Sequence, residues 1–145
     1  MILIIDDDNL EAQVLAIMLR QQYRVSGESL EYIVMTTGSD ALEWLRGQLP
    51  QSVTAVILDR HLKHREDGLN LIVQLRGSDA LTNNSAIIVR SIADDPDSIA
   101  AAYNAQADGF ISKSRRVSTK KLLDLLDNLW QYPQRSSRPW IAITM

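Results

Sequence analysis

Short apolar runs alternate along the chain with longer stretches of helical periodicity. The runs are aliphatic, rich in β-branched residues and bounded by polar residues, a pattern typical of buried strands. They are Ile2–Ile5, Tyr32–Thr36, Val53–Leu58, Ala86–Ser91 and Gly109–Ser112. The sequence therefore predicts five strands.

Helical patterns occupy the stretches between and after these runs. The clearest is Ser118–Gln131, with Ser118 as N-cap and apolar residues at helical spacing: Leu122, Leu125, Leu126, Leu129 and Trp130. Further helices are expected over Asn9–Tyr23, from a capping box at Thr37 through Trp44, over Leu69–Arg76 and over Pro96–Gln106. In the first of them, Leu10, Val14, Ile17 and Met18 are expected to face the core.

The regular alternation of strand and helix determines the fold class. Parallel strands need crossover connections, so the pattern favours an α/β fold with a parallel sheet and helices on both faces. Residues 1–132 are expected to form this domain, with Pro133 ending the last helix. Residues 133–145 are expected to be a tail or the start of a linker, because a polar, basic stretch there becomes apolar again from Trp140.

Composition narrows the classes of function. The 145 residues are 46% hydrophobic and 23% charged, which fits one globular domain with a buried core. The net charge of −3 argues against binding of nucleic acid or anionic membranes by this domain. Met1 precedes only four apolar residues and then acids, and no signal peptide or membrane span is evident, so a cytoplasmic location is expected.

The residues that carry chemistry follow the predicted strands. In open α/β sheets, ligands bind beyond the carboxyl ends of the strands. The polar residues expected there are Asp6, Asp7, Asp8, Asp59, Ser91 and Lys113. If the first and third strands are neighbours, the carboxylates of Asp6, Asp7 and Asp59 converge, and a hard divalent cation such as Mg²⁺ or Mn²⁺ would offset their repulsion.

A carboxylate beside such a cation can attack phosphorus and form an aspartyl phosphate. We expect Asp59 to be this nucleophile, because it directly follows the most apolar central run. Lys113 would give the phosphoryl group a point charge, and the Ser91 hydroxyl would donate a hydrogen bond. Alone, Asp6–Asp8 could equally cap the first helix.

Together these residues resemble the receiver domains of response regulators in bacterial two-component pathways. The segments that carry the resemblance are Ile2–Asp7, Val56–Asp59, Asp67–Gly68, Ile87–Ser91 and Gly109–Lys113. It implies a flavodoxin-like, five-stranded parallel sheet of order 2-1-3-4-5. It also implies phosphorylation of Asp59, with metal held by Asp7, Asp59 and the main-chain oxygen of His61, and by Asp6 through water.

The same resemblance implies partners and a switch. Phosphodonors would be a histidine kinase or a histidine phosphotransfer protein. On phosphorylation Ser91 would move toward the phosphoryl group and Phe110 would turn inward. The face made by the fourth helix, fifth strand and fifth helix would then bind an output partner, an attached effector or a second copy. Such a domain is not an enzyme beyond slow self-phosphorylation and autodephosphorylation.

Three features depart from the family pattern. Ser114 follows Lys113 where proline is usual, Ile92 stands where a small residue is usual, and the Asp59–Gly68 connection is one residue longer, with charges at 64–66. They motivate one alternative, a receiver-like binding module that is not phosphorylated, although all three acids are retained. A second alternative is a magnesium-dependent aspartyl-phosphate phosphohydrolase, against which the short chain without a lid argues.

Overall fold

The computed structural model describes residues 1–25, 31–62, 66–113, 119–132 and 134–144. Five residues that the predictions above involve lie outside this part of the chain: His64 and Arg65 in the lengthened loop, Ser114, the predicted N-cap Ser118, and Pro133, which was predicted to end the last helix.

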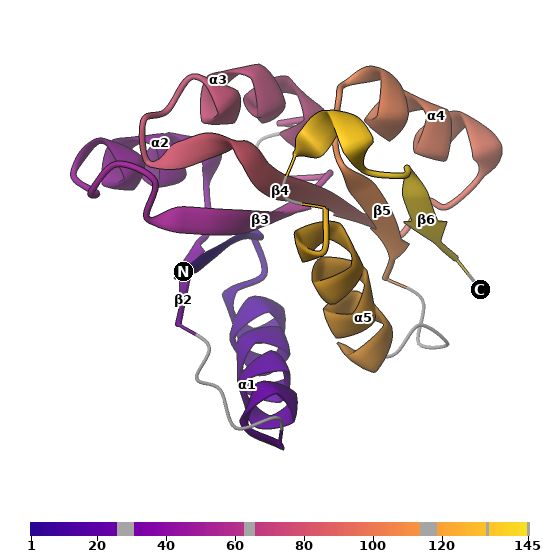
Figure 1. Ribbon diagram of the computed structural model, residues 1–145, viewed down its shortest axis with the longest axis horizontal. Coiled ribbons are helices and arrows are strands. Elements are labelled where there is room, and N and C mark those ends of the chain that lie inside the picture. Colours follow the sequence, from indigo (N-terminus) through magenta and orange to yellow (C-terminus); the bar gives the residue numbers. More distant parts are fainter. Residues whose placement is uncertain (26–30, 63–65, 114–118, 133, 145) are drawn as a thin grey trace.

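Six described strands form one parallel sheet in the order β2-β1-β3-β4-β5-β6 (Figure 1). They are β1 (Ile2–Ile5), β2 (Tyr32–Met35), β3 (Val53–Asp59), β4 (Leu81–Ser91), β5 (Gly109–Ser112) and β6 (Ile141–Ile143). The predicted α/β class and the order 2-1-3-4-5 are confirmed. The expected number of five strands was too low, because β6 adds to the free edge of β5.

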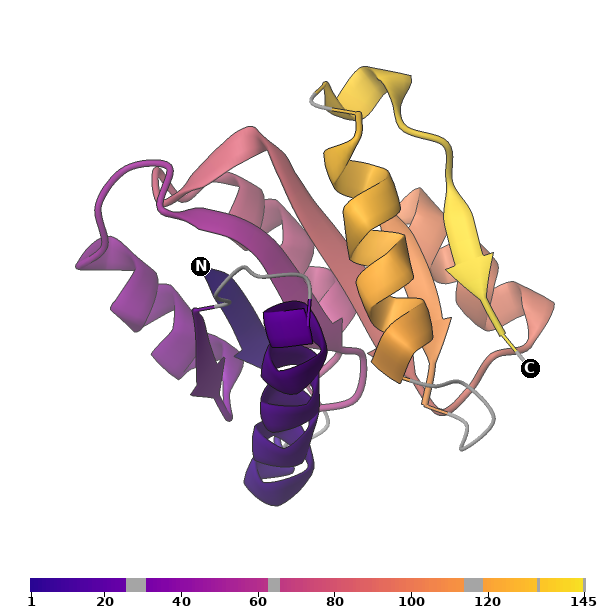
Figure 2. The ribbon, with the colours of Figure 1, turned by 60° about the horizontal axis from the view of Figure 1, so that its bottom comes forward.

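Helices cover both faces of the sheet, as Figures 1 and 2 show. One face carries α1 (Asn9–Val25) and α5 (Thr119–Trp130); the other carries α2 (Gly38–Arg46), α3 (Ile72–Arg76) and α4 (Pro96–Asn104). Two short 3₁₀ helices, η2 (Gly68–Leu71) and η3 (Arg135–Ser137), lie in connections. Each face buries its own apolar layer, so the central strands are buried on both sides and most of their buried residues are apolar.

Side-chain caps fix where three of the helices begin. The Thr37 hydroxyl accepts a hydrogen bond from the Asp40 amide at 3.0 Å, and Asp95 accepts one from the Ser98 amide at 3.3 Å, as the sequence predicted. Asp8 accepts one from the Glu11 amide at 2.9 Å. Each bond satisfies an amide that has no partner within its helix.

The expectation for α1 was wrong in one respect. Leu10 is 76% exposed, and Val14, Ile17 and Met18 are also exposed. The buried face is instead made by residues that share a second helical stripe: Ala12, Leu15, Ala16 and Leu19. The alanines allow the helix backbone to approach the sheet closely, and this leaves the larger apolar stripe facing outward.

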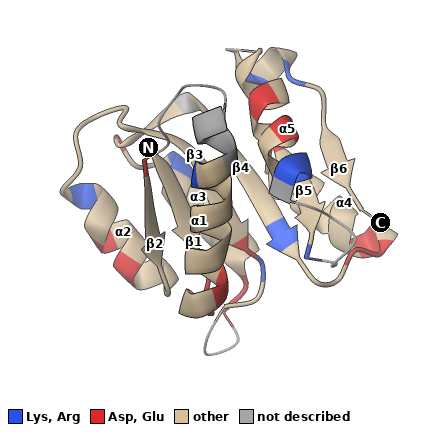
Figure 3. Cartoon of the chain, turned by 90° about the horizontal axis from the view of Figure 1, so that it is seen from below, with Lys and Arg blue, Asp and Glu red and all other residues tan. Residues whose placement is uncertain are grey.

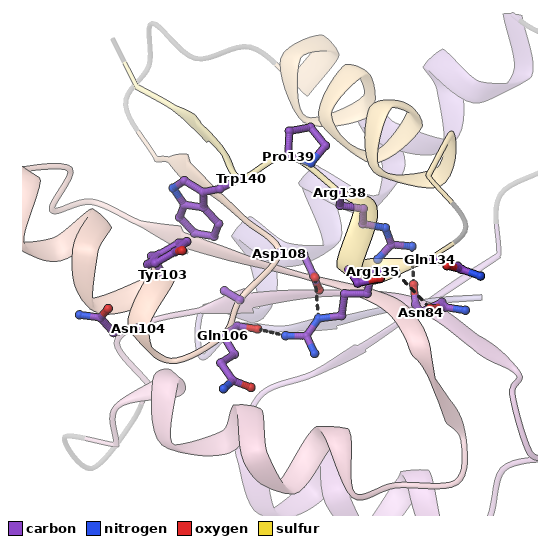
Figure 4. Close-up of a pocket in the computed structure, with 12 residues that line it drawn as sticks. Asn84, Tyr103, Asn104, Gln106, Asp108, Gln134, Arg135, Arg138, Pro139 and Trp140 are labelled. Atoms are coloured by element: carbon purple, nitrogen blue, oxygen red, sulfur yellow. Dashed lines mark hydrogen bonds and ion pairs between the residues drawn. The ribbon is translucent and has the colours of Figure 1, made fainter.

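The segment after α5 is fastened to the sheet by two arginines (Figure 4). Arg135 Nε donates to Asp108 Oδ1 at 2.8 Å, and its Nη2 donates to the main-chain oxygen of Gln106 at 2.6 Å. Arg138 Nε donates to the main-chain oxygen of Leu129 at 2.9 Å and Nη2 to that of Asn84. These bonds direct the chain into β6, which explains why the expected tail is part of the sheet.

β6 also contacts α4 through the residue that precedes it. The rings of Trp140 and Tyr103 lie edge to face, with centroids 5.4 Å apart.

None of the described helices is both long enough and apolar enough to cross a membrane.

Candidate functional site

Three acids gather at the carboxyl end of the sheet. Asp6 follows β1, Asp7 comes next, and Asp59 is the last residue of β3. Their carboxylate oxygens lie within 4.8 Å of one another, and the residues Asp6 and Asp59 are only 2% and 5% exposed. Figure 3 shows acidic segments at the start of α1, with basic segments nearby on the strands. The predicted convergence of the three acids is therefore confirmed.

Local hydrogen bonds position these acids. The Asp6 amide donates to the main-chain oxygen of Met35 at 3.0 Å, and Asp6 Oδ1 accepts from the Asp8 amide at 3.0 Å. Asp8 in turn caps α1. The capping interpretation thus holds for Asp8, whereas the carboxylate of Asp6 belongs to the acid cluster.

The main chain after β3 surrounds Asp59 closely. The His61 amide donates to Asp59 Oδ1 at 3.2 Å, so the main chain of His61 lies beside the predicted acceptor. Its carbonyl oxygen as a metal ligand stays a prediction. A Cβ added to Gly68 would lie 2.2 Å from the main-chain oxygen of Asp59, so only glycine fits at this close approach.

Lys113 joins the acids from the end of β5. Its Nζ lies 2.9 Å from Asp59 Oδ2 and 3.4 Å from Asp6 Oδ2. Burial lowers the pKa of Lys113, but the hydrogen bond to Asp59 and the nearby carboxylate charges outweigh it, so the pKa is raised overall. The ammonium group is therefore held charged, and the sequence placed this residue correctly.

The gathering of the acids raises the pKa of Asp6. Burial, with a further contribution from the Asp59 carboxylate, raises its pKa from 3.8 to about 6, against the opposing effects of the Asp8 amide and Lys113. Burial and like charge both disfavour the ionised form. A bound cation would remove this conflict.

The donor set fits a hard divalent cation. Asp6, Asp7 and Asp59 each offer a carboxylate oxygen, the ligand that Mg²⁺ and Mn²⁺ prefer, and Asp7 is only partly buried and thus open to solvent. The side-chain part of the predicted metal site therefore has suitable chemistry and spacing.

The two predicted switch residues lie on neighbouring strands. Ser91 ends β4, and its hydroxyl oxygen is buried without a hydrogen bond to any described residue. Phe110 in β5 is fully buried in the layer beneath α4 and already faces the core. Ile92, next to Ser91, is 78% exposed.

Two residues at this site were not predicted. Arg90 Nη1 lies 3.6 Å from Asp6 Oδ2 and 3.1 Å from Glu11 Oε1, and Glu11 in turn lies 3.9 Å from Lys113 Nζ. The signal in the sequence was a single charged residue inside the buried run Ala86–Ser91. Strand alternation together with the register of β3 and β4 places Arg90 on the face of Asp59, its neighbour in the sheet, and only the alternation could have been taken from the sequence.

A family model for the response regulator receiver domain matches residues 2–127. A two-component response regulator from Clostridium difficile gives a TM-score of 0.72 at 19% identity, covering 90% of this chain and 95% of that chain. A response regulator from Burkholderia pseudomallei, with a phosphorylated aspartic acid, calcium ion and citrate, gives a TM-score of 0.69 at 20% identity, and the match covers 90% of this chain and 68% of that chain. A putative response regulator from Chloroflexus aurantiacus J-10-fl gives 0.68 at 25% identity, covering 90% and 96%. No curated protein sequence matches the chain.

Proposed function

Because the chain belongs to the response regulator receiver family, we propose that it accepts a phosphoryl group on Asp59 from a phosphohistidine donor. One observation carries the proposal: Asp59 lies within a cluster of three carboxylates and is also hydrogen-bonded by Lys113 at 2.9 Å. A buried nucleophile beside a fixed ammonium and potential metal ligands is suited to phosphoryl transfer.

The proposed transfer requires little from the protein except positioning. A carboxylate oxygen of Asp59 forms a bond to phosphorus, the bond between phosphorus and the donor imidazole breaks, and the imidazole keeps the electron pair and then takes up a proton. Lys113 offsets negative charge on the phosphoryl oxygens, and the His61 amide holds the other Asp59 oxygen. Mg²⁺ held by Asp6, Asp7 and Asp59 would supply further positive charge to those oxygens.

The proposed response begins at Ser91. Its buried hydroxyl, which has no hydrogen bond to a described residue, would donate to a phosphoryl oxygen, and the resulting shift of β4 would reach Phe110, which pairs with Val89 across the sheet. Phe110 packs in the layer that also contacts Trp140. Any output partner that uses the face of α4, β5 and α5 therefore meets β6 and Trp140 there.

The proposed donor surface is α1. Its exposed apolar residues Leu10, Val14 and Ile17 lie on the helix that starts beside Asp6 and Asp7, where a helical donor could pack while its histidine reaches Asp59. A histidine kinase or histidine phosphotransfer protein fits this role. The compartment of the chain would then be the cytoplasm, where such donors transfer phosphate.

Incubation with Mg²⁺ and acetyl phosphate, followed by intact mass measurement, tests the proposal. We expect one added phosphoryl group on the wild type and none on Asp59→Asn, because the amide cannot act as the nucleophile. The matched control is Asp97→Asn, an exposed acid in α4, which should be labelled as the wild type is. Binding of beryllofluoride, followed by NMR of Phe110, reports the switch independently.

The same experiment separates the alternatives. Labelling of Asp59→Asn at the wild-type level would show that another residue is the acceptor. Absence of labelling by acetyl phosphate and by a cognate kinase, with no response to beryllofluoride, would favour the binding module that is not phosphorylated. Release of inorganic phosphate from phosphomonoesters over many turnovers would favour the phosphohydrolase instead.

A further inference from the structure

Arg90 is a charged residue that directly follows the buried apolar run Ala86–Val89 of the central strand β4. It is the neighbour of Asp59 across the sheet, and Leu58 and Val89 form the preceding pair. Since side chains alternate along a strand, Arg90 and Asp59 lie on the same face, opposite to Leu58 and Val89 in the layer beneath α3 and α4. The register of β3 and β4 therefore places the guanidinium group of Arg90 beside the acid cluster.

The contacts of Arg90 show how it is held there. Nη1 lies 3.1 Å from Glu11 Oε1 and 3.6 Å from Asp6 Oδ2, and the side chain is 17% exposed. Nη1 is buried but makes no hydrogen bond of acceptable geometry to a described residue. Lys113, by contrast, donates a hydrogen bond to Asp59 at 2.9 Å. Arg90 is thus attached mainly by charge, which makes it the more easily displaced of the two cations.

Both Arg90 and a divalent cation would draw on the same carboxylate. Asp6 Oδ2 lies 3.6 Å from Arg90 Nη1, and Asp6 is also one of the three acids that fit a metal ion. Two positive groups cannot share one carboxylate at close range without repulsion. Glu11, which is not one of these three acids, offers Arg90 a second and nearer anion at 3.1 Å.

We infer that Arg90 is a positioning residue that competes with the divalent cation for Asp6 and so sets the metal affinity of the phosphoacceptor site, with Glu11, already its nearer anion, as the partner that receives it alone when metal binds. The inference rests on the proposed function, because it concerns the metal that supports phosphoryl transfer. It implies that the metal-loaded state is reached at higher Mg²⁺ than the three carboxylates alone would require.

Titration of the full chain with Mg²⁺ alone, by calorimetry at fixed ionic strength and pH, tests the inference. Arg90→Met removes the charge and keeps most of the side-chain volume, and it should tighten Mg²⁺ binding about tenfold. Arg90→Lys keeps the charge and should stay near the wild type. The matched control is Arg60→Met, since Arg60 follows Asp59 but pairs with Asp67 at 3.8 Å instead of with the acid cluster.

A double-mutant cycle tests the part assigned to Glu11. Glu11→Gln should weaken Mg²⁺ binding severalfold in the wild type, because Arg90 then has only Asp6. The same change should have a clearly smaller effect when Arg90 is already methionine. Equal effects in the two backgrounds would overturn the role of Glu11 as the receiving partner.

Unchanged or weaker Mg²⁺ binding by Arg90→Met, or the same tightening in Arg60→Met, would overturn the inference. So would a loss of beryllofluoride affinity in Arg90→Met at saturating Mg²⁺, which would make Arg90 a ligand of the phosphoryl group. Acetyl phosphate labelling of the wild type separates the two proposals. If the wild type is phosphorylated but Arg90→Met binds Mg²⁺ as the wild type does, only this inference fails. If the wild type is not phosphorylated but Arg90→Met binds Mg²⁺ about tenfold more tightly, only the proposed function fails.

Discussion

The two ends of the sheet each bury an aspartate against basic residues, but in different proportions. At the carboxyl end, the carboxylates of Asp6 and Asp59 share Lys113. At the opposite end, Asp108 has a partner for each oxygen: Arg135 bonds Oδ1, while Arg76 and the Ile87 amide bond Oδ2. One end has an excess of acid, and the other has a fully paired acid.

This difference separates a site from a structural contact. Asp108 is 7% exposed, and both of its oxygens accept hydrogen bonds within the fold, two of them from arginines that balance its charge. The acid cluster has carboxylates within 4.8 Å of one another and too few nearby cations, so it can accept a metal ion. Burial of a charged group alone therefore does not indicate function; the balance of charge around it does.

Removing the aspartate at each end should have very unequal consequences for stability, and this is the largest effect we expect. Asp108→Ala leaves two half-buried arginines without their carboxylate and should lower the free energy of unfolding by about 3–5 kcal/mol. Asp59→Asn relieves repulsion among the acids and should change it by less than about 1 kcal/mol. Urea unfolding without divalent cation measures both. Similar losses in the two variants would break the distinction.

The raised pKa of Asp6 in the acid cluster should make the free energy of unfolding depend on pH. Asp6 has a pKa of about 6 when folded against 3.8 ordinarily, so the folded state binds the proton more tightly. Its contribution to stability is therefore fully present below about pH 3.8 and is lost as the pH rises through about 6. This amounts to about 2–3 kcal/mol.

Asp6→Asn cannot ionise and serves as the comparison for this effect. The free energy of unfolding of the variant minus that of the wild type should grow between pH 4 and pH 7, measured by urea unfolding without metal. Parallel stability curves for the two proteins would contradict the assignment to Asp6.

A smaller effect is expected at Gly68, which tests how tightly the acceptor loop is built. An added Cβ would lie 2.2 Å from the Asp59 main-chain oxygen, so Gly68→Ala should cost about 2 kcal/mol and slow phosphorylation of Asp59. Gly77→Ala is the control, because its Cβ would meet no atom closer than 3.5 Å. Equal stability of the two variants would show that the loop after β3 yields easily.

The fold was predictable because its signals are local. Buried parallel strands need continuous apolar runs, and these located all of the strands β1 to β5, although β4 begins at Leu81 and not at the predicted Ala86. Which side of α1 packs against the sheet was not predictable in the same way. Leu10 and Leu15 lie on two different apolar stripes of the helix, and only packing against the sheet determines which stripe is buried. The strand β6 was missed because Ile141–Ile143 is short and its position depends on Arg135 and Arg138.

The residues around the candidate site also include some that local sequence signals identify and some that they do not. Asp59 and Lys113 were found because they directly follow strands, where the topology of the sheet brings residues together. Glu11 and Asp108 were missed because their partners, Arg90 and Arg76, are distant in the sequence. Such pairs depend on strand register and side-chain reach, which a pattern of apolar positions does not specify.

The unpartnered hydroxyl of Ser91 has a consequence for the equilibrium between two conformations. A buried polar group without a hydrogen bond costs about 1–3 kcal/mol. Under the proposed function, only the phosphorylated protein offers this hydroxyl an acceptor. The unmodified conformation of β4 is thus the less satisfied of the two, and phosphorylation at Asp59 would shift their populations by relieving an existing penalty in addition to forming a new bond.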